Sequence, residues 1–175
     1  MSACKLMNIL LSGERNSGKS KLINEFLKSC SRTSGGFKTV RIKTQIDDFS
    51  GIYLIDLSKP ETALTAQNRA GTCTPSRQPI SHEHIFETVG AKALSFIELP
   101  DLIIMDEIGV LESECTKFKQ KILECLSSPA DVLGVVKKKN SDFLNSIRAR
   151  EDVLILNVNS NNHKQIMSLL KEYLC

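Results

Sequence analysis

The sequence predicts an α/β fold of three layers, in which a mostly parallel central sheet carries helices on both faces. Three continuous apolar runs support this prediction: Leu102–Met105, Val132–Val136 and Val153–Leu156. Such runs are typical of parallel strands that are buried on both faces. Amphipathic helical patterns separate the runs, and the alternation of strands with helices indicates this fold class. The chain of 175 residues shows no repeat or linker, so we expect one domain, 1–175.

A glycine-rich loop follows the first predicted strand. The apolar run Met7–Leu11 predicts a buried strand, and Lys19–Ser29 carries the apolar stripe of a helix. Between them, Gly13–Ser20 matches G-x-x-x-x-G-K-[ST], in which backbone N–H groups and the helix N-terminus surround nucleotide phosphates. Lys19 is expected on the β- and γ-phosphates, and the Ser20 hydroxyl on Mg²⁺. The predicted nucleotide-binding residues are Gly13, Glu14, Arg15, Asn16, Ser17, Gly18, Lys19 and Ser20.

The next part of the chain predicts a hairpin and a long polar stretch. Gly35–Gly36 interrupts the pattern, and Phe37–Lys43 then alternates between apolar and polar residues, as a half-buried strand does. Ile52–Leu57 is the expected hairpin partner, across a polar loop at Thr44–Gly51. The stretch Lys59–Ser81 has few apolar residues. Long irregular stretches are usually functional or mobile, so we expect a flexible flap near the nucleotide.

The rest of the chain shows helical periodicity between the apolar runs. The expected helices are Ile85–Ile97, which ends before Pro100, then Cys115–Leu126, Asn140–Arg150 and a last helix from about Asn161. Ser160 or Asn161 is the expected N-cap of the last helix.

Two carboxylates follow the buried strand Leu102–Met105. Open α/β sheets bind ligands at the carboxyl ends of their strands, which is where Asp106 and Glu107 are placed. Asp106 is expected to complete the Mg²⁺ shell opposite Ser20. Glu107 is expected to act as a catalytic base that polarises a water molecule for attack on the γ-phosphate. A base beside the metal indicates hydrolysis more than simple binding.

Hydrolysis also benefits from a positive charge near the developing γ-phosphate oxygens. Arg148 is the first candidate for this catalytic role, because it precedes a strand whose neighbour should lead into the site. Arg150 has the same placement, and Arg15, Arg41 and Lys43 follow as weaker candidates. For each of these side chains, simple solvation is the alternative. His82 and His84 form an H-x-H pair for which a capping or surface role is expected rather than a metal site.

The composition narrows the class of protein. Apolar residues make up 41% and charged residues 25% of the chain, as in globular domains. A net charge of +3 is too small to indicate a nucleic acid or an anionic membrane as a partner, and no apolar stretch is long enough to span a bilayer. The six cysteines form no C-x-x-C pair and no secretory leader is visible, so we expect free thiols in a reducing cytoplasm.

The chain resembles the THEP-type nucleoside-triphosphatases, a family that includes the cancer-related nucleoside-triphosphatase. Asp106–Gly109 with Glu112 is similar to the family's D-E-I-G-x-x-E segment. Four further segments resemble the family's G-F-x-T, L-G-T-[IV], I-R-x-R and N-V-T motifs, in the order Gly36–Thr39, Leu133–Val136, Ile147–Arg150 and Asn157–Val158. The resemblance therefore covers nearly the whole chain.

This resemblance implies a RecA-like P-loop domain that hydrolyses ATP, GTP and other nucleoside triphosphates with Mg²⁺, slowly and with little base selectivity. The chain departs from the family at Asn16, where a glycine is usual, but Asn tolerates a positive φ and the loop can still form. It also has Val40–Lys43 where the family has Glu residues and an Arg, and it lacks the family's V-G-x-Y strand around residues 73–85. These departures bear on how fast the chain hydrolyses nucleotides and on which nucleotides it accepts.

The sequence therefore predicts a Mg²⁺-dependent nucleoside-triphosphatase, and two alternatives stay open. A nucleoside or nucleotide kinase would need an acceptor pocket and a basic lid, for which Arg69 and Arg77 are available. A nucleotide-binding switch would turn over negligibly without an unidentified protein partner. A Ras-type GTPase is disfavoured because the sequence contains no N-K-x-D motif.

Overall fold

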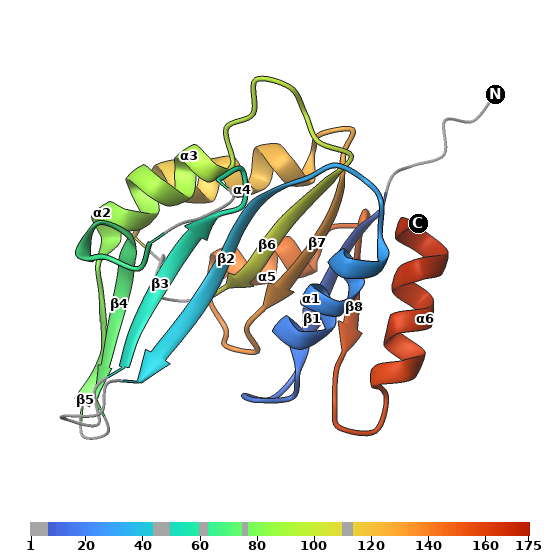
Figure 1. Cartoon of the computed structure of the whole chain (residues 1–175), viewed down its shortest axis with the longest axis horizontal. Helices are drawn as coiled ribbons and strands as arrows, with labels where there is room; N and C mark the ends of the chain where they lie inside the picture. Colours follow the sequence, from blue (N-terminus) through green and yellow to red (C-terminus); the bar gives the residue numbers. More distant parts are fainter. Residues whose placement is uncertain (1–6, 44–49, 60–62, 75–76, 110–113) are drawn as a thin grey trace.

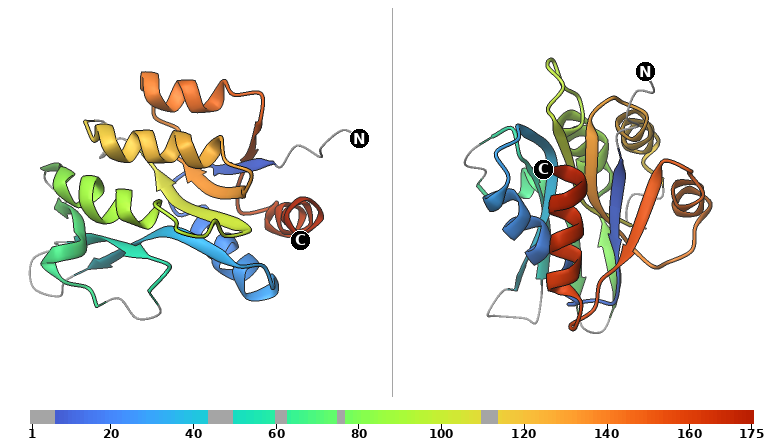
Figure 2. Two further views of the ribbon diagram at one scale, coloured as in Figure 1. Left: turned by 90° about the horizontal axis from the view of Figure 1, so that it is seen from above. Right: turned by 90° about the vertical axis from the view of Figure 1, so that its right-hand side faces the viewer.

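The structure is a computed structural model that describes residues 7–43, 50–59, 63–74, 77–109 and 114–175. These residues form a three-layer α/β domain with a central sheet between two sets of helices, as predicted (Figures 1 and 2). The described sheet has eight strands in the order β5-β4-β3-β2-β6-β7-β1-β8. The strands are β1 (Asn8–Ser12), β2 (Ser34–Lys43), β3 (Ser50–Asp56), β4 (Arg69–Thr74), β5 (Arg77–Ser81), β6 (Leu102–Ile108), β7 (Asp131–Val136) and β8 (Val153–Asn157).

Helices cover both faces of this sheet. Figure 2 shows α1 and α6 on one face, and α2 to α5 on the other. The helices are α1 (Lys19–Ser29), α2 (Glu83–Ile85), the π-helical turn η2 (Phe86–Gly90), α3 (Ala91–Ala93), α4 (Thr116–Leu126), α5 (Asp142–Arg148) and α6 (His163–Leu174). Within the described ranges, no helix is both long and apolar enough to cross a membrane.

The sheet is mostly parallel, as expected. Strands β2, β6, β7, β1 and β8 pair in parallel, and β3, β4 and β5 extend the sheet on the β2 side as antiparallel strands. Leu102–Met105 and Val132–Val136 are buried, as their apolar runs predict. Val153–Leu156 is only half-buried, contrary to the prediction, because β8 is an edge strand that has a neighbour on one side alone.

Strand β2 begins earlier than its residue pattern suggests. Gly35–Gly36 was expected to interrupt the chain, yet both glycines lie inside β2 and pair with Ile103 and Ile104 of β6. Gly36 has a φ of 105°, and a Cβ atom there would collide with the Ile104 carbonyl. The glycine therefore permits a close parallel pairing rather than a turn. The hairpin of β2 with β3 is confirmed, and most of the expected Thr44–Gly51 loop lies outside the described residues.

The prediction of an irregular flap at Lys59–Ser81 is wrong for the part that the structure describes. This stretch contains β4, β5 and a short 3-10 helix, η1 (Ala66–Asn68), and β4 pairs antiparallel with β3. Ala70 is completely buried, which shows that a small residue provides the inward contact of this strand. A few inward residues suffice on this antiparallel edge, so the sequence lacks a strong apolar pattern. Strand β5 forms without the family's V-G-x-Y sequence.

Two helix boundaries also differ from the prediction. The helical segment that starts at Glu83 ends at Ala93, so Phe96 and Ile97 lie beyond it. The Ser95 hydroxyl donates a hydrogen bond to the Ala91 carbonyl at 2.8 Å, so a side chain satisfies an acceptor at this helix end. Helix α6 begins after Asn162, whose side-chain oxygen accepts a hydrogen bond from the Asn159 N–H at 2.9 Å. Asn162 occupies the N-cap position instead of Ser160 or Asn161, and its side chain bonds to the preceding loop without capping the helix.

Candidate active site

The glycine-rich loop joins the end of β1 to the start of α1 (Figure 1). Its backbone has a positive φ at Asn16 (62°) and at Gly18 (88°). Asn tolerates this conformation better than other non-glycine residues, so the loop forms although Asn16 replaces the usual glycine. A Cβ atom at Gly13 would collide with the Val158 carbonyl, and one at Gly18 would collide with the ring of His163. The two glycines thus let the loop lie directly against the chain after β8 and the start of α6.

The Lys19 side chain folds back over this loop. Its Nζ atom donates hydrogen bonds to the Gly13 carbonyl at 3.1 Å, the Glu14 carbonyl at 2.6 Å and the Ser17 hydroxyl at 3.0 Å. Burial lowers the pKa of Lys19, and the nearby carboxylates of Glu107 and Glu14 act in the opposite direction. The ammonium group is therefore held at the centre of the loop, where bound phosphate oxygens can replace its carbonyl acceptors.

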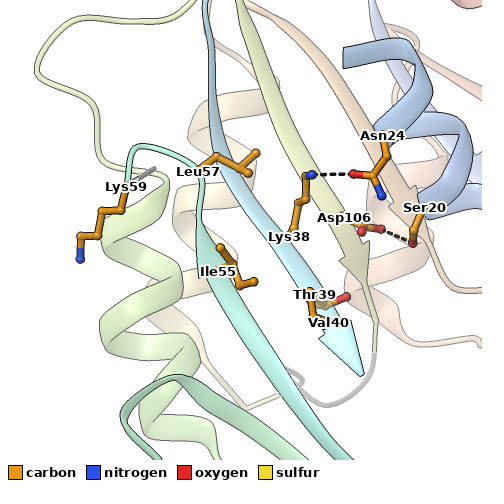
Figure 3. Close-up of a pocket in the computed structure, with 9 residues that line it drawn as sticks. All are labelled: Ser20, Asn24, Lys38, Thr39, Val40, Ile55, Leu57, Lys59 and Asp106. Atoms are coloured by element: carbon orange, nitrogen blue, oxygen red, sulfur yellow. Dashed lines mark hydrogen bonds between the residues drawn. The ribbon is translucent and has the colours of Figure 1, made fainter. Parts of the chain in front are cut away.

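Ser20 and Asp106 come together from α1 and β6, which are far apart in the sequence. The Ser20 hydroxyl donates a hydrogen bond to Asp106 Oδ1 at 3.0 Å (Figure 3). Asp106 is only 2% exposed, and burial raises its pKa to about 6, against the opposing effect of the Ser20 hydrogen bond. A hydroxyl and a buried carboxylate side by side are oxygen ligands of the kind that Mg²⁺ prefers. The donor set therefore fits the predicted metal.

Glu107 occupies a strained position at the end of β6. Its φ is 83°, and the pairing of β6 with β7 shifts register between Met105 and Ile108. This irregularity turns Glu107 away from the regular alternation of the strand. Its carboxylate forms an ion pair with Lys137, the first residue after β7. Backbone strain of this kind clusters at functional sites, where the surrounding structure holds it in place.

A cavity of about 390 Å³ opens beside the Ser20–Asp106 pair (Figure 3). Its walls come from α1, β2, β6, β3 and the residues just after β3, and they combine polar and apolar side chains: Ser20, Asn24, Lys38, Thr39, Val40, Ile55, Leu57, Lys59 and Asp106. Lys38 Nζ donates to Asn24 Oδ1 at 2.5 Å across the cavity. The cavity therefore places positive charge close to the expected metal ligands.

The predicted cations have other partners in the structure. Arg148 donates to the carbonyls of Lys137 and Lys139, and to Asn145 Oδ1 at 3.1 Å. Arg150 forms an ion pair with Asp152 at 2.7 Å. A direct contact of Arg148 with the γ-phosphate stays a prediction. It would require the guanidinium to leave the backbone oxygens that hold it.

The histidine pair lies at the start of α2, where His82 occupies the N-cap position without a side-chain capping hydrogen bond. The His82 ring lies 3.3 Å from the Thr72 hydroxyl, and no group of three or more metal-binding side chains occurs among the described residues. Cys115 at the N-cap of α4 and Cys125 within α4 are both buried, as small core residues should be. Glu112 of the family-like segment lies outside the described residues.

Sequence reasoning missed three residues that contact the site. His163 Nε2 lies 2.6 Å from the Ser17 carbonyl, which can only accept, so Nε2 carries the proton and donates. Lys137 pairs with Glu107, and Lys138 pairs with Glu14 of the loop at 2.7 Å. The run Lys137–Lys139 was visible in the sequence, but only the parallel order β6-β7-β1 brings it between the two acidic residues.

Comparisons with known proteins identify the family of this chain. Residues 8–170 match the model of a family described as NTPase. Nucleoside-triphosphatase THEP1 of Thermotoga maritima is 30% identical over 174 residues, which cover 94% of this chain and 96% of that protein. Nucleoside-triphosphatase THEP1 of Methanothermobacter thermautotrophicus is 26% identical over 175 residues, which cover 95% of this chain and 98% of that protein.

Two solved structures share the fold. The crystal structure of THEP1 from the hyperthermophile Aquifex aeolicus has a TM-score of 0.71 at 17% identity, and the alignment covers 96% of this chain and 99% of that one. The solution structure of a human cancer-related nucleoside triphosphatase has a TM-score of 0.70 at 22% identity, with coverages of 95% and 96%. On the family match and the sequence relatives, the chain belongs to the NTPase family of THEP1-type nucleoside-triphosphatases.

Proposed function

We propose that this protein is a Mg²⁺-dependent nucleoside-triphosphatase that converts ATP, GTP and other nucleoside triphosphates to the diphosphate and phosphate. We further propose that it does so slowly, with broad base specificity, in the cytoplasm. The observation that carries the proposal is the convergence of Lys19, Ser20, Asp106 and Glu107 at one edge of the sheet. Membership in the NTPase family supports hydrolysis as the reaction.

The loop Gly13–Ser20 binds the triphosphate in this proposal. Its backbone N–H groups and the N-terminus of α1 face the phosphates, and Lys19 exchanges the Gly13 and Glu14 carbonyls for phosphate oxygens. The exchange is favourable because a phosphate oxygen carries more negative charge than a carbonyl oxygen. Lys19 thereby reduces the repulsion that the triphosphate would impose on an incoming nucleophile.

Ser20 and Asp106 would hold Mg²⁺, which would neutralise part of the charge of the phosphates. Asp106 must be ionised for this role. Burial raises the pKa of Asp106, and a cation nearby would favour its ionised form. The Ser20 hydroxyl oxygen would offer a lone pair to the same cation, while its hydrogen donates to Asp106 Oδ1.

Glu107 would orient the attacking water. The water oxygen forms a bond to the γ-phosphorus while the bond from that phosphorus to the β–γ bridging oxygen breaks, and Glu107 takes the proton that the water releases. The proton later passes to the products, so Glu107 returns to its ionised form. A strained backbone fixes Glu107 at the strand end, which limits the number of positions that its carboxylate can take.

The second candidate function is phosphoryl transfer to a nucleoside or nucleotide. The cavity of about 390 Å³ beside Ser20 and Asp106 favours it, since Lys38 and Lys59 would suit an anionic acceptor. Glu107 directly after Asp106 favours water instead.

Phosphate release from ATP, GTP, CTP and UTP, with Mg²⁺ and with excess chelator, tests the proposal. We expect release from all four with Mg²⁺ and none above background with chelator. Adding nucleosides and nucleoside monophosphates then tests the kinase alternative. Phosphorylated acceptor together with absent phosphate release would replace the hydrolase proposal with a kinase. Binding without either product would indicate a nucleotide-dependent switch.

A further inference from the structure

We propose that Lys137 is the in-cis cation of this site, and that Arg148 acts as a positioning residue that fixes it. In the nucleotide-free protein Lys137 neutralises Glu107, and with a triphosphate bound it moves to the γ-phosphoryl oxygens. The inference rests on the proposed function, because it assigns the positive charge that hydrolysis at this site requires.

The backbone of Lys137 is held on both sides. Its N–H donates to the Ile108 carbonyl at 2.9 Å, which ties it to the strand that carries Asp106 and Glu107. Its carbonyl accepts a hydrogen bond from Arg148, which also donates to the Lys139 carbonyl at 3.1 Å. Arg148 is fixed in turn by Asn145 on the same helix, α5. The guanidinium therefore holds the backbone at the start of the Lys137–Lys139 segment in place, so only the Lys137 side chain would have to move to reach a bound phosphate.

The path of the Lys137 side chain leads over Gly109 to Glu107. A Cβ atom at Gly109 would lie 2.8 Å from Lys137 Cδ and 3.2 Å from Cε, so this glycine leaves room for the lysine stem. The Lys137 and Glu107 side chains are 33% and 36% exposed, so the pair is open to solvent and not locked in the core. Breaking an ion pair this exposed costs little free energy. A phosphate oxygen therefore competes with Glu107 for the Lys137 ammonium group more strongly than water does.

Several charges of the site act on one another. Glu107 is the largest charge that raises the pKa of Lys19, against the dominant effect of burial, so Glu107 lies near the loop Gly13–Ser20. Lys137 is therefore paired with a carboxylate that lies near the loop proposed to bind the phosphates. Lys138 is directed elsewhere, to Glu14 on the exposed side of the loop, at 2.7 Å. Lys139 has an exposed side chain and contributes only its carbonyl, to Arg148.

Exchange of Lys137 from Glu107 to the phosphate links binding to catalysis. While Lys137 pairs with Glu107, its ammonium group occupies the carboxylate that would otherwise contact the attacking water. When Lys137 moves to the γ-phosphoryl oxygens, Glu107 is free to accept the proton of the attacking water. At the same time the ammonium group stabilises the charge on these oxygens as the β–γ bond breaks. Without a γ-phosphate the pair re-forms.

The test compares Lys137→Gln and Lys137→Arg with Lys139→Gln, which removes the same charge two residues away. We expect Lys137→Gln to lower kcat by about 10²–10³-fold, with the Kd for the nucleoside diphosphate changed less than about 3-fold. Binding of the diphosphate with Mg²⁺ and aluminium fluoride, which resembles the transferred phosphoryl group, should weaken by a similar factor. Lys137→Arg should keep part of the activity, and Lys139→Gln should match the wild type.

Arg148→Gln separates positioning from direct contact. If Arg148 acts through Lys137, Arg148→Gln lowers kcat, and the double variant Lys137→Gln/Arg148→Gln is no slower than Lys137→Gln alone. If the two effects multiply, Arg148 acts independently of Lys137 and the positioning role is wrong.

Four further results decide the proposal. The proposal is overturned if the wild type turns over and Lys137→Gln has the same kcat and the same affinity for the aluminium fluoride complex. A rise in kcat for Lys137→Gln would also overturn it, because Lys137 would then only inhibit Glu107. Absence of wild-type hydrolysis would overturn the proposed function and this inference together. If Lys137→Gln does not fold, Lys137→Met replaces it with the same expected and contradicting results, because Met removes the charge and keeps an unbranched side chain.

Discussion

The carboxylate of Asp106 lies in a buried position and accepts a hydrogen bond from the Ser20 hydroxyl at 3.0 Å. Two effects compete there. Burial disfavours the charged form and raises the pKa to about 6, while the hydroxyl donor favours the charged form. Burial dominates in the protein without metal or nucleotide. A divalent cation would reverse this balance, so this residue couples metal binding to folding stability.

This balance predicts a pH-dependent effect of Asp106→Asn on the metal-free, nucleotide-free protein. The folded pKa of Asp106 is raised above its ordinary value of 3.8, so its contribution to stability is complete below pH 3.8 and is lost as the pH rises through about 6. The amide that replaces the carboxyl group in the variant cannot ionise, so its contribution does not change with pH. We therefore expect the free energy of unfolding of Asp106→Asn to exceed that of wild type at pH 7 by up to about 3 kcal/mol.

Urea unfolding of both proteins in chelator at pH 4, 5, 6 and 7 measures this difference. The difference should be close to zero at pH 4 and should grow toward pH 7. A difference that does not change between pH 4 and pH 7 would show that Asp106 ionises freely in the folded protein.

Some residues of the site were predictable because a motif fixes their spacing, and others were not. Lys19, Ser20 and Asp106 follow from local patterns, and the structure brings Ser20 and Asp106 together as expected. Lys137 has no local signal, because its proximity to Glu107 depends on the order of β6 and β7 in the sheet and on an irregular pairing between them. Contacts between distant segments are set by topology, which residue patterns describe only indirectly.

At the scale of elements, helix α6 supports the phosphate-binding loop from the side. The His163 ring, in the first turn of α6, donates to the Ser17 carbonyl at 2.6 Å and covers Gly18. The loop therefore depends on an element from the other end of the chain. The sequence indicated only that the last helix begins near Asn161, since the contact of His163 with the loop requires β1 and β8 to be neighbours.

The contact predicts that His163→Ala weakens nucleotide binding more than catalysis. A single hydrogen bond contributes about 1 kcal/mol, so we expect the Kd for the nucleoside diphosphate to rise by about 3–10-fold. The kcat at saturating substrate should change by less than about 2-fold, because His163 contacts the loop backbone and not the expected position of the attacking water. Calorimetric titration together with phosphate release measures both quantities.

Lys164→Ala is the matched control, because Lys164 is exposed on the same turn of α6. It should bind as wild type does. An unchanged Kd for His163→Ala would show that the loop holds its shape without α6.

Boundaries of elements were predicted less well than their existence. Strand β2 passes through Gly35 and Gly36 because these residues allow close pairing with β6, whereas glycine pairs usually indicate a turn. Strand β4 escaped prediction because Ala70 is a weak apolar signal. In both cases tertiary pairing, which is not visible in a short window of sequence, overrides the local preference.

For the whole molecule, the sheet divides into a part that carries the site and a part that extends it. The parallel strands β1, β6 and β7 bring the phosphate-binding loop, the acidic pair and the lysine segment to one edge. The antiparallel strands β3 to β5 extend the sheet beyond β2, and the cavity beside Asp106 lies where the two parts meet (Figure 3). The fold class and most of the parallel core were predictable from buried apolar runs, while the antiparallel extension was only partly predictable.

The central claim is that one site binds the triphosphate through Lys19 and cleaves it through Glu107. Single-turnover cleavage of γ-labelled ATP with Mg²⁺, measured together with ATP binding for wild type, Glu107→Gln and Lys19→Ala, tests it most directly. We predict that Glu107→Gln binds ATP about as tightly as wild type but cleaves it at least about 10²-fold more slowly. Lys19→Ala should bind ATP poorly. Cleavage by Glu107→Gln at the wild-type rate, or tight ATP binding by Lys19→Ala, would contradict the account.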